Sequence, residues 1–339
     1  MKRKGIASGG NLVVDFVKIV DSYPKQGTLS NISLYSRSTG GAVTNVLIDL
    51  AKIDGTLPLC AIGLVGCDDN GEYVIQRLRE YGIDTGQVRK HDELGTSFTD
   101  VIAVQTAGER TFFHYRGANA AFSIGNIDFD NLNVDILHIG YALLLDTLDM
   151  EDEEYGTVMA RLLAKAQKHG IKTSMDVVSE NSDRFSKLVP PSLKYTDYCV
   201  VNEIEASMIT EIPARDGNGR LIIDNIKQMC SRLFAMGVGK WTVIHSPEMG
   251  CGMDSDGSIY VQPSVDVPKE FIKGKVGAGD AFCAGILYAA YMKWSLEKAL
   301  VTASATAACC LSEANTTDGM KPISEAMEIF EKYPKMDLK

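Results

Sequence analysis

Signatures of several familiar enzyme classes are missing from this chain. It contains no Cys-x-x-Cys pair, no His-Glu-x-x-His and no two histidines at metal-ligand spacing, which argues against a zinc site. A serine-hydrolase elbow, a Walker A loop and a Gly-x-Gly-x-x-Gly dinucleotide fingerprint are also absent, and the glycine run at 63–71 has the wrong spacing for that fingerprint. A nucleotide, if one binds, must therefore be held in another way.

Long apolar runs and blocks of positive charge are missing too. The formal net charge is -10 over 339 residues, and Lys and Arg form no block longer than residues 2–4, so nucleic-acid binding is not expected. No uninterrupted apolar stretch approaches the length of a membrane span, and no targeting segment is recognised near the start of the chain. The eight cysteines, several of them inside apolar runs, fit buried thiols in a reducing compartment. We therefore expect a cytoplasmic protein that contacts neither nucleic acid nor a membrane.

What the chain does contain is an alternation of strand-like and helix-like segments. Strands are expected at 12–14, 59–65, 136–139, 173–178, 198–201 and 241–245. Helices are expected at 41–53, 73–81 and 153–169, and from residues 280 and 296 onward. This alternation is typical of an α/β fold with a mainly parallel central sheet flanked by helices in three layers, and we expect a single domain over residues 1–339.

Two stretches, 16–38 and 96–116, break the alternation. Both are rich in β-branched and aromatic residues with polar residues interleaved, and the second carries a turn signal at 107–109. They are expected to form antiparallel ribbons that return to one edge as a small β-sheet. Such a sheet would cover the strand ends, where open α/β sheets bind their ligands.

The most informative segment is Val-Gly-Ala-Gly-Asp-Ala-Phe at 276–282, a glycine-rich turn that opens an apolar helix. Ligand oxygens can approach the backbone of Gly277 and Gly279, and N–H groups of the first helical turn can face an anion. A carboxylate at Asp280 would repel a phosphate, unless it takes a proton from an attacking hydroxyl. The alternative is that Asp280 only caps the helix.

Three further motifs each carry a functional and a structural interpretation. Asp15 in Gly-Asn-Leu-Val-Val-Asp at 10–15 could bind two hydroxyls of a polyol, or serve a turn. The pair Gly40-Gly41 leads into a helix with Asn45 one turn inside, or simply marks helix entry. Asn202 and Glu205, three residues apart at a helix start, could hold phosphate and the waters of Mg²⁺, or form a capping box.

Taken in order, these segments resemble the ribokinase-like (PfkB) family of carbohydrate kinases over nearly the whole chain. Gly-Gly-Ala-Val-Thr-Asn at 40–45 is similar to its N-terminal signature and 276–282 to its C-terminal one. Gly-Glu-Arg-Thr-Phe at 108–112 and Gly-Ala-Asn at 117–119 resemble its lid region. The resemblance implies an ATP- and Mg²⁺-dependent transfer of a phosphoryl group to a hydroxyl, expected to be primary, of a small sugar or sugar acid.

The resemblance also implies a role for each matching residue. Asp280 would be the general base, and the backbone of Gly277, Ala278 and Gly279 would form an anion hole. The remaining implied contacts are with substrate (Asn11, Asp15, Gly41, Asn45 and Arg116), nucleotide (Asn202, Ser246 and Gly250) and metal (Glu205 through water, and Asp176). The two inserted ribbons would form a lid that excludes water.

The chain departs from the family pattern at three places. Gly274-Lys275 replaces an Asp-Thr pair, which puts a monovalent-cation loop in doubt, and 245–250 replaces a Thr-x-Gly-x-x-Gly segment of the nucleotide site. Asp176 alone remains of an Asp-x-Asn-x-Arg segment.

Several alternatives stay open at this point. Arg116 either faces a substrate carboxylate or anchors the lid to the body. A nucleoside kinase and a catalytically weak sugar-binding regulator remain as alternative functions, and exposed lid edges make a homodimer an expected assembly.

Overall fold

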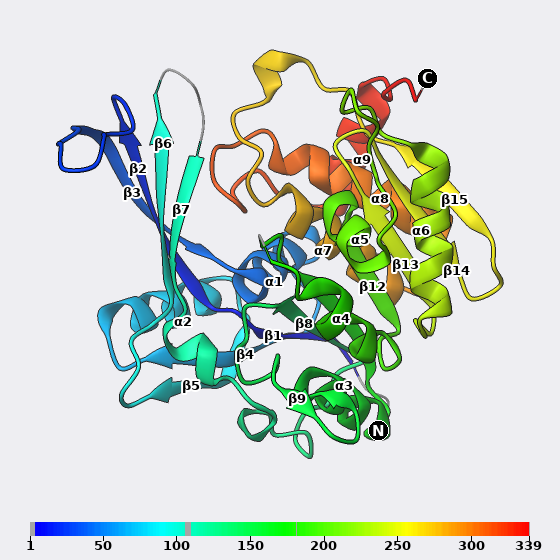
Figure 1. Cartoon of the computed structure of the whole chain (residues 1–339), viewed down its shortest axis with the longest axis horizontal. Coiled ribbons are helices and arrows are strands. Elements are labelled where there is room, and N and C mark those ends of the chain that lie inside the picture. Colours follow the sequence, from blue (N-terminus) through cyan, green and yellow to red (C-terminus); the bar gives the residue numbers. More distant parts are fainter. Residues whose placement is uncertain (1–3, 106–109, 181, 339) are drawn as a thin grey trace.

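The computed structural model describes residues 4–105, 110–180 and 182–338. Within those ranges, its central sheet is built from β1 (Ile6–Gly10), β4 (Leu59–Gly66), β5 (Asp84–His91), β8 (Ile136–Ala142), β11 (Lys172–Val177), β12 (Tyr198–Asn202), β13 (Trp241–His245), β14 (Met249–Asp254) and β15 (Ile259–Pro263). Their order is β15-β14-β13-β12-β11-β8-β1-β4-β5 (Figure 1). The strands from β13 to β5 run parallel to one another, and β14 is antiparallel to both of its neighbours.

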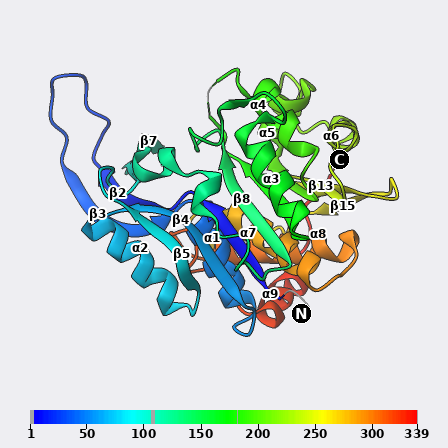
Figure 2. The same ribbon diagram turned by 90° about the horizontal axis from the view of Figure 1, so that it is seen from below.

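Helices form a layer on each face of this sheet (Figure 2). One layer consists of α1 (Ala42–Ile53), α2 (Asp69–Glu80), α7 (Ala278–Tyr291), α8 (Leu296–Cys310) and α9 (Ile323–Lys332). The other consists of α3 (Val158–Lys168), α4 (Phe185–Leu193), α5 (Glu203–Thr210) and α6 (Ile223–Ala235). Short 3-10 turns lie at Gly117–Ala121, Ile124–Asn126 and Lys269–Phe271. Each layer packs its own apolar core against the sheet, so the expected three-layer arrangement is confirmed.

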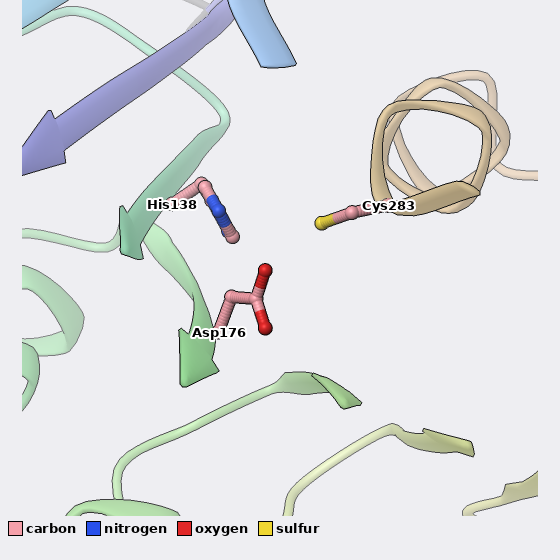
Figure 3. Close-up of side chains that lie close together, drawn as sticks. All are labelled: His138, Asp176 and Cys283. Carbon is pink, nitrogen blue, oxygen red and sulfur yellow. The ribbon is translucent and has the colours of Figure 1, made fainter. Parts of the chain in front are cut away.

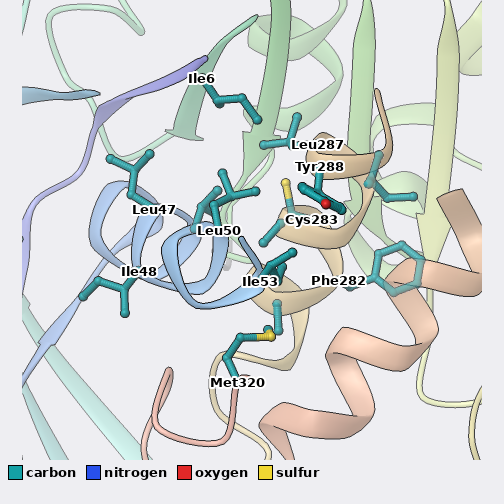
Figure 4. Packing of buried hydrophobic residues seen from close by; sticks show 14 of the residues in the cluster. Ile6, Leu47, Ile48, Leu50, Ile53, Phe282, Cys283, Leu287, Tyr288 and Met320 are labelled. Carbon is teal, nitrogen blue, oxygen red and sulfur yellow. The ribbon is translucent and has the colours of Figure 1, made fainter. Parts of the chain in front are cut away.

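Helix α7 lies inside its layer, against both α1 and α8 (Figure 4). Residues 280–290 are all buried, as expected for a helix that is apolar on every side. At Gly285 an added Cβ would come within 2.7 Å of the Ala303 Cα on α8, so glycine permits the close approach of the two helices. This packing fixes the glycine-rich turn at the start of α7 relative to the sheet.

A second, smaller sheet stands beside the central one (Figure 1). It contains β2 (Val13–Val20), β3 (Ile32–Gly40), β6 (Phe98–Val104) and β7 (Arg110–Tyr115), in the order β3-β2-β6-β7. The pairs β2–β3 and β6–β7 are antiparallel, which confirms the two ribbons expected from the sequence, and β2 and β6 join them in parallel. The turn signal at 107–109 lies outside the described residues.

Several of the boundaries expected from the sequence are wrong. The helix expected from 73 begins at Asp69, because the Asp68 side chain accepts a hydrogen bond from the Gly71 N–H and caps it there. The first strand of the central sheet is β1, and the segment 12–14 leads into β2 of the small sheet, because the chain changes direction at Gly10, whose φ of 123° suits glycine. The helix expected from 153 begins at Val158, because the Thr157 side chain accepts a hydrogen bond from the Ala160 N–H and caps it there. The residues before it pair as β9 (Glu151–Asp152) and β10 (Gly156–Thr157).

Within the described ranges, no helix is both long enough and apolar enough to cross a bilayer.

Candidate active site

The carboxyl ends of five neighbouring parallel strands bring polar side chains to one edge of the central sheet. Asn11 follows β1, Tyr141 lies near the end of β8, Asp176 near the end of β11, and Asn202 and His245 end β12 and β13. All five line cavities at this edge. This is the position at which open α/β sheets bind ligands.

Asp280, in the first turn of α7, faces these strand ends. The Asn45 Nδ2 donates to one carboxylate oxygen at 2.8 Å, and the Tyr141 hydroxyl donates to the other at 2.7 Å. The side chain is only 8% exposed, and burial raises its pKa while the two hydrogen bonds lower it. Two donors from α1 and β8 thus hold the carboxylate in one orientation, with lone pairs left to accept a proton.

The turn before Asp280 is held tightly against the loop that follows α8. Gly277 has a φ of 85°, and an added Cβ would lie 2.5 Å from the Thr316 carbonyl oxygen, so a larger residue would displace the turn. No side chain caps the helix here. The first N–H groups of α7 are therefore not bound by a capping side chain and can turn toward an anion, although the Ala278 N–H makes a long contact of 3.4 Å with the Lys275 carbonyl oxygen.

Two cavities meet at this turn. The first, of about 520 Å³, lies on the Asp280 side and extends under the small sheet, with Thr99, Phe112 and His114 in its wall. The second, of about 510 Å³, lies on the other side of the turn. The two share Asn202, His245 and Gly279 as lining residues. A ligand in one cavity can therefore meet a ligand in the other across the start of α7.

The second cavity is mainly apolar, with a few polar groups. Val265, Val267 and Leu311 are among its apolar walls. The Ser304 hydroxyl, on α8, is buried in this wall without a hydrogen-bond partner among the described residues. Lys275 is an exposed lysine at its edge. Such a slot fits a flat heterocycle that offers one hydrogen bond, with an anionic group toward Lys275.

The first cavity is strongly acidic. Four carboxyl groups line it (Asp15, Asp176, Glu205 and Asp280), whereas none of its lining residues in the described ranges is Lys or Arg. Burial raises the pKa of Asp15 to about 6 and that of Glu205 to about 7. Burial together with Glu205 and Asp280 raises the pKa of Asp176 well above its usual range. These carboxyl groups are poised to accept hydrogen bonds from hydroxyls or to face a cation.

Most of the predicted substrate residues come together here. Asn11, Asp15 and Gly41 line the first cavity, and Asn11 Nδ2 is buried with no partner in the described structure. Asn45 does not line the cavity, but its side chain donates a hydrogen bond to Asp280, which does. Gly40 was predicted only as part of a helix entry, yet an added Cβ there would lie 2.2 Å from an Asp15 carboxylate oxygen. Glycine therefore makes room for Asp15.

Arg116 does not line the first cavity. Its guanidinium donates to Asp146 at 2.6 Å and to the Leu143 carbonyl at 3.2 Å, in the segment after β8. These contacts fit the interpretation in which Arg116 anchors the lid to the body, and they leave its predicted contact with a substrate carboxylate without support.

Of the predicted nucleotide residues, Asn202 and Ser246 line the second cavity and Gly250 does not. Gly250 packs in the core, where an added Cβ would lie 2.8 Å from the Phe282 ring, so its role is packing. Asn202 and Glu205 form the capping box that the sequence offered as the structural interpretation. Glu205 nevertheless lines the first cavity while its oxygens accept from the Asn202 N–H and the Ser179 hydroxyl.

These acidic residues fit the requirements of Mg²⁺. The ion prefers carboxylate oxygens and keeps several waters, and Asp176 and Glu205 lie beside the turn where the cavities meet. The hydrogen bonds from Asn202 and Ser179 orient the Glu205 carboxylate, which suits contact with Mg²⁺ through a water molecule.

Sequence reasoning missed two residues of the site. Tyr141 belongs to no recognised motif, and its contact with Asp280 depends on how β8 and α7 pack. His245 appeared only as a departure from a glycine-rich pattern, yet it lines both cavities, and burial lowers its pKa to about 4 so that it is neutral at pH 7.

Comparison with known proteins assigns the chain to a family. The model of the pfkB family carbohydrate kinases matches residues 3–323. A 5-dehydro-2-deoxygluconokinase of Clostridium beijerinckii is 25% identical, with 98% of this chain and 94% of the relative covered. Fructokinase-1 of Zea mays is 23% identical, with 97% and 98% covered.

Solved structures agree in fold. Arabidopsis thaliana ribokinase, complexed with ribose and ATP, matches with a TM-score of 0.79 at 20% identity, covering 98% of this chain and 99% of that one. A structure from E. coli in complex with ATP and Mg²⁺ matches with a TM-score of 0.76 at 18% identity, covering 97% and 99%. On the sequence match, this chain belongs to the pfkB family of carbohydrate kinases.

Proposed function

We propose that this protein transfers the γ-phosphoryl group of ATP to a hydroxyl, expected to be primary, of a small sugar, with Asp280 as general base. The observation that carries the proposal is the pair of cavities that meet at the turn 277–279, with the Asp280 carboxylate on one side of it. A phosphoryl donor in the second cavity and an acceptor in the first would face each other across this turn, as an in-line transfer requires.

The acceptor side would act as follows. Asn11 and Asp15 bind hydroxyls of the sugar and direct one of them toward Asp280, which takes its proton as the oxygen attacks phosphorus. The hydrogen bonds from Asn45 and Tyr141 keep the carboxylate in place throughout. The small sheet over the cavity excludes water, which would otherwise compete as acceptor.

The donor side would be held by the backbone of the turn and by the second cavity. The N–H groups at Gly277, Ala278 and Gly279 face charge that develops on the transferred group, and their fixed orientation needs no rearrangement during the reaction. Lys275 would neutralise phosphate charge. Asn202 and Ser246 would contact the nucleotide.

The metal would lie on the acidic side of the turn. Mg²⁺ would be held by Glu205 through water and by Asp176. Bound there, it would supply positive charge to the phosphates. Gly274 stands where the family pattern has an Asp, so we expect turnover without a monovalent cation.

For the acceptor, we propose a neutral sugar. A carboxylate substrate would meet the Asp15, Asp176, Glu205 and Asp280 side chains with no Lys or Arg from the described lining to offset them. Unpaired like charges in a partly buried site cost several kcal/mol. The relatives carry both possibilities, since one is a kinase of a keto sugar acid and another is a fructokinase.

A panel of acceptors tests the proposal. ADP release is measured with ATP and Mg²⁺ on neutral sugars, the corresponding sugar acids and nucleosides, with kcat/KM as the readout. We expect turnover on a neutral sugar at least tenfold above that on its acid. Turnover on nucleosides alone would favour a nucleoside kinase, and sugar binding without ADP release would favour a regulator; either result contradicts the proposal.

We further propose that two copies pair through the small sheet. Its strands expose several large apolar or aromatic side chains, each at least 43% exposed, namely Ile32, Leu34, Tyr35, Phe112, Phe113 and Tyr115. Exposed strand edges with apolar side chains favour association with a second chain. Analytical ultracentrifugation of the wild type and of Leu34→Asp checks this: a dimer that the substitution dissociates is expected, and a monomeric wild type contradicts it.

A further inference from the structure

Three side chains able to ligate a metal meet beneath the floor of the first cavity. His138 comes from β8, Asp176 from β11 and Cys283 from α7, and they point toward a common space (Figure 3). One ligand atom from each lies within 4.8 Å of the other two, and all three residues are buried. Their separation in the chain explains why no ligand spacing appears in the sequence.

The imidazole is the most telling member of the cluster. His138 is 0% exposed, and its Nε2 has no hydrogen-bond partner in the described part of the chain. Its Nδ1 lies 3.0 Å from the Ser174 hydroxyl. With the proton on Nδ1 and donated to Ser174, the Nε2 lone pair is left unused, which is the arrangement that metal-bound imidazoles adopt. A buried polar nitrogen without a partner costs free energy, and a bound cation would recover it.

The set of donors selects the kind of metal. One nitrogen, one oxygen and one sulfur suit zinc, whereas Mg²⁺ prefers oxygen alone. Zinc bonds of about 2.0–2.3 Å place ligand atoms roughly 3.3–3.8 Å apart, so side-chain shifts of about 1 Å would close the site. Asp176 also lines the first cavity, which gives an entry route and room for a water as fourth ligand.

The surrounding charges favour a cation as well. The Glu205 and Asp280 carboxyl groups lie close to Asp176, and Asp280 also lies close to Cys283. A divalent cation would offset this negative charge and hold the thiol as thiolate.

We propose that His138, Asp176 and Cys283 form a binding site for a thiophilic divalent cation of the zinc class. The site differs from the proposed Mg²⁺ site in its His138 and Cys283 donors, and the two sites share Asp176. It requires no turnover, so its test does not depend on the proposed kinase activity.

Direct metal binding to the full-length protein tests the site. Chelator-treated protein is titrated with Zn²⁺, with bound metal measured per chain, and with Co²⁺, whose thiolate complexes absorb in the near ultraviolet. We expect one Zn²⁺ per chain and a thiolate–Co²⁺ band. Cys283→Ser should abolish the band, and both Cys283→Ser and His138→Gln should weaken Zn²⁺ binding at least tenfold.

Cys60→Ser is the matched control, because Cys60 is also a buried cysteine but lies on β4, outside the cluster. It should leave stoichiometry and band unchanged. Circular dichroism checks that each variant is folded. If Cys283→Ser does not fold, the Zn²⁺ affinity of His138→Gln provides the test. Binding below one Zn²⁺ per chain, absence of the thiolate band, or unchanged affinity in the folded cluster variants would overturn the proposal.

Discussion

Replacement of Asp15 by Asn should stabilise the ligand-free protein above neutral pH, although Asp15 is expected to bind substrate. The Asp15 carboxyl lies in the first cavity, where burial is the main cause that raises its pKa from 3.8 to about 6, the nearby Asp280 adds to the rise, and a hydrogen bond from Thr99 opposes it. Ionisation of this group is therefore harder in the folded chain than in the unfolded chain.

The sign and size of the effect follow from that difference. Below pH 4 both states are protonated and the carboxyl costs nothing. Between pH 4 and pH 6 the unfolded chain ionises at this position while the folded chain stays protonated, so stability falls as pH rises; above pH 6 both states are ionised and the full loss remains. A rise of about 2 pKa units corresponds to about 3 kcal/mol. With an unfolding entropy of about 2.1 cal/mol/K per residue, that is roughly a 4 °C rise in Tm for Asp15→Asn.

Thermal unfolding of wild type and Asp15→Asn between pH 5 and pH 8, without ligands, measures this. The gain in Tm should be largest at pH 8 and should shrink toward pH 5. Asp21→Asn is the control, since Asp21 is exposed at the end of β2 and its substitution should change stability by less than about 0.5 kcal/mol. A loss of stability in Asp15→Asn, or a gain that does not vary with pH, would refute the reasoning.

Three further substitutions probe the turn and its two sides. In Gly277→Ala, the residue must keep a φ of 85°, and its Cβ would lie 2.5 Å from the Thr316 carbonyl oxygen. We therefore expect kcat in steady-state assays to fall at least 100-fold. A near-normal kcat would contradict the tight packing of the turn. Ser304→Ala should raise the KM for ATP several-fold with little change in kcat, and an unchanged KM would mean that the hydroxyl meets no nucleotide atom. Tyr141→Phe removes a donor that lowers the pKa of Asp280, so the acidic limb of the kcat/KM profile should shift to higher pH, and a shift to lower pH would conflict with the assigned hydrogen bond.

Local patterns sufficed to predict much of this protein. The glycines at 277 and 279, the apolar run after them and Asp280 lie within one short segment, so their arrangement follows from the sequence of that segment alone. The same holds for Asn202 and Glu205 at a helix start. Their order along the chain carried the family resemblance, which the family match confirms.

Features that depend on long-range packing were not predictable from local patterns. Tyr141 reaches Asp280 only because β8 and α7 pack together, and the two residues are far apart in the chain. Gly250 was predicted to contact the nucleotide, but it packs against the Phe282 ring, which leaves no room for a side chain at this position. The sequence left two interpretations of Arg116 open, and its partner Asp146 lies in a segment without a recognisable motif, so this contact could not be predicted.

The central claim is that Asp280 removes the proton of the acceptor hydroxyl, and Asp280→Asn tests it most directly. Asn keeps the size of the side chain and cannot accept that proton. We expect kcat for the acceptor sugar to fall by at least 100-fold, while binding of ATP and sugar, measured by calorimetry, and the thermal transition stay close to those of the wild type. A folded Asp280→Asn variant that turns over at a rate near that of the wild type would contradict the account.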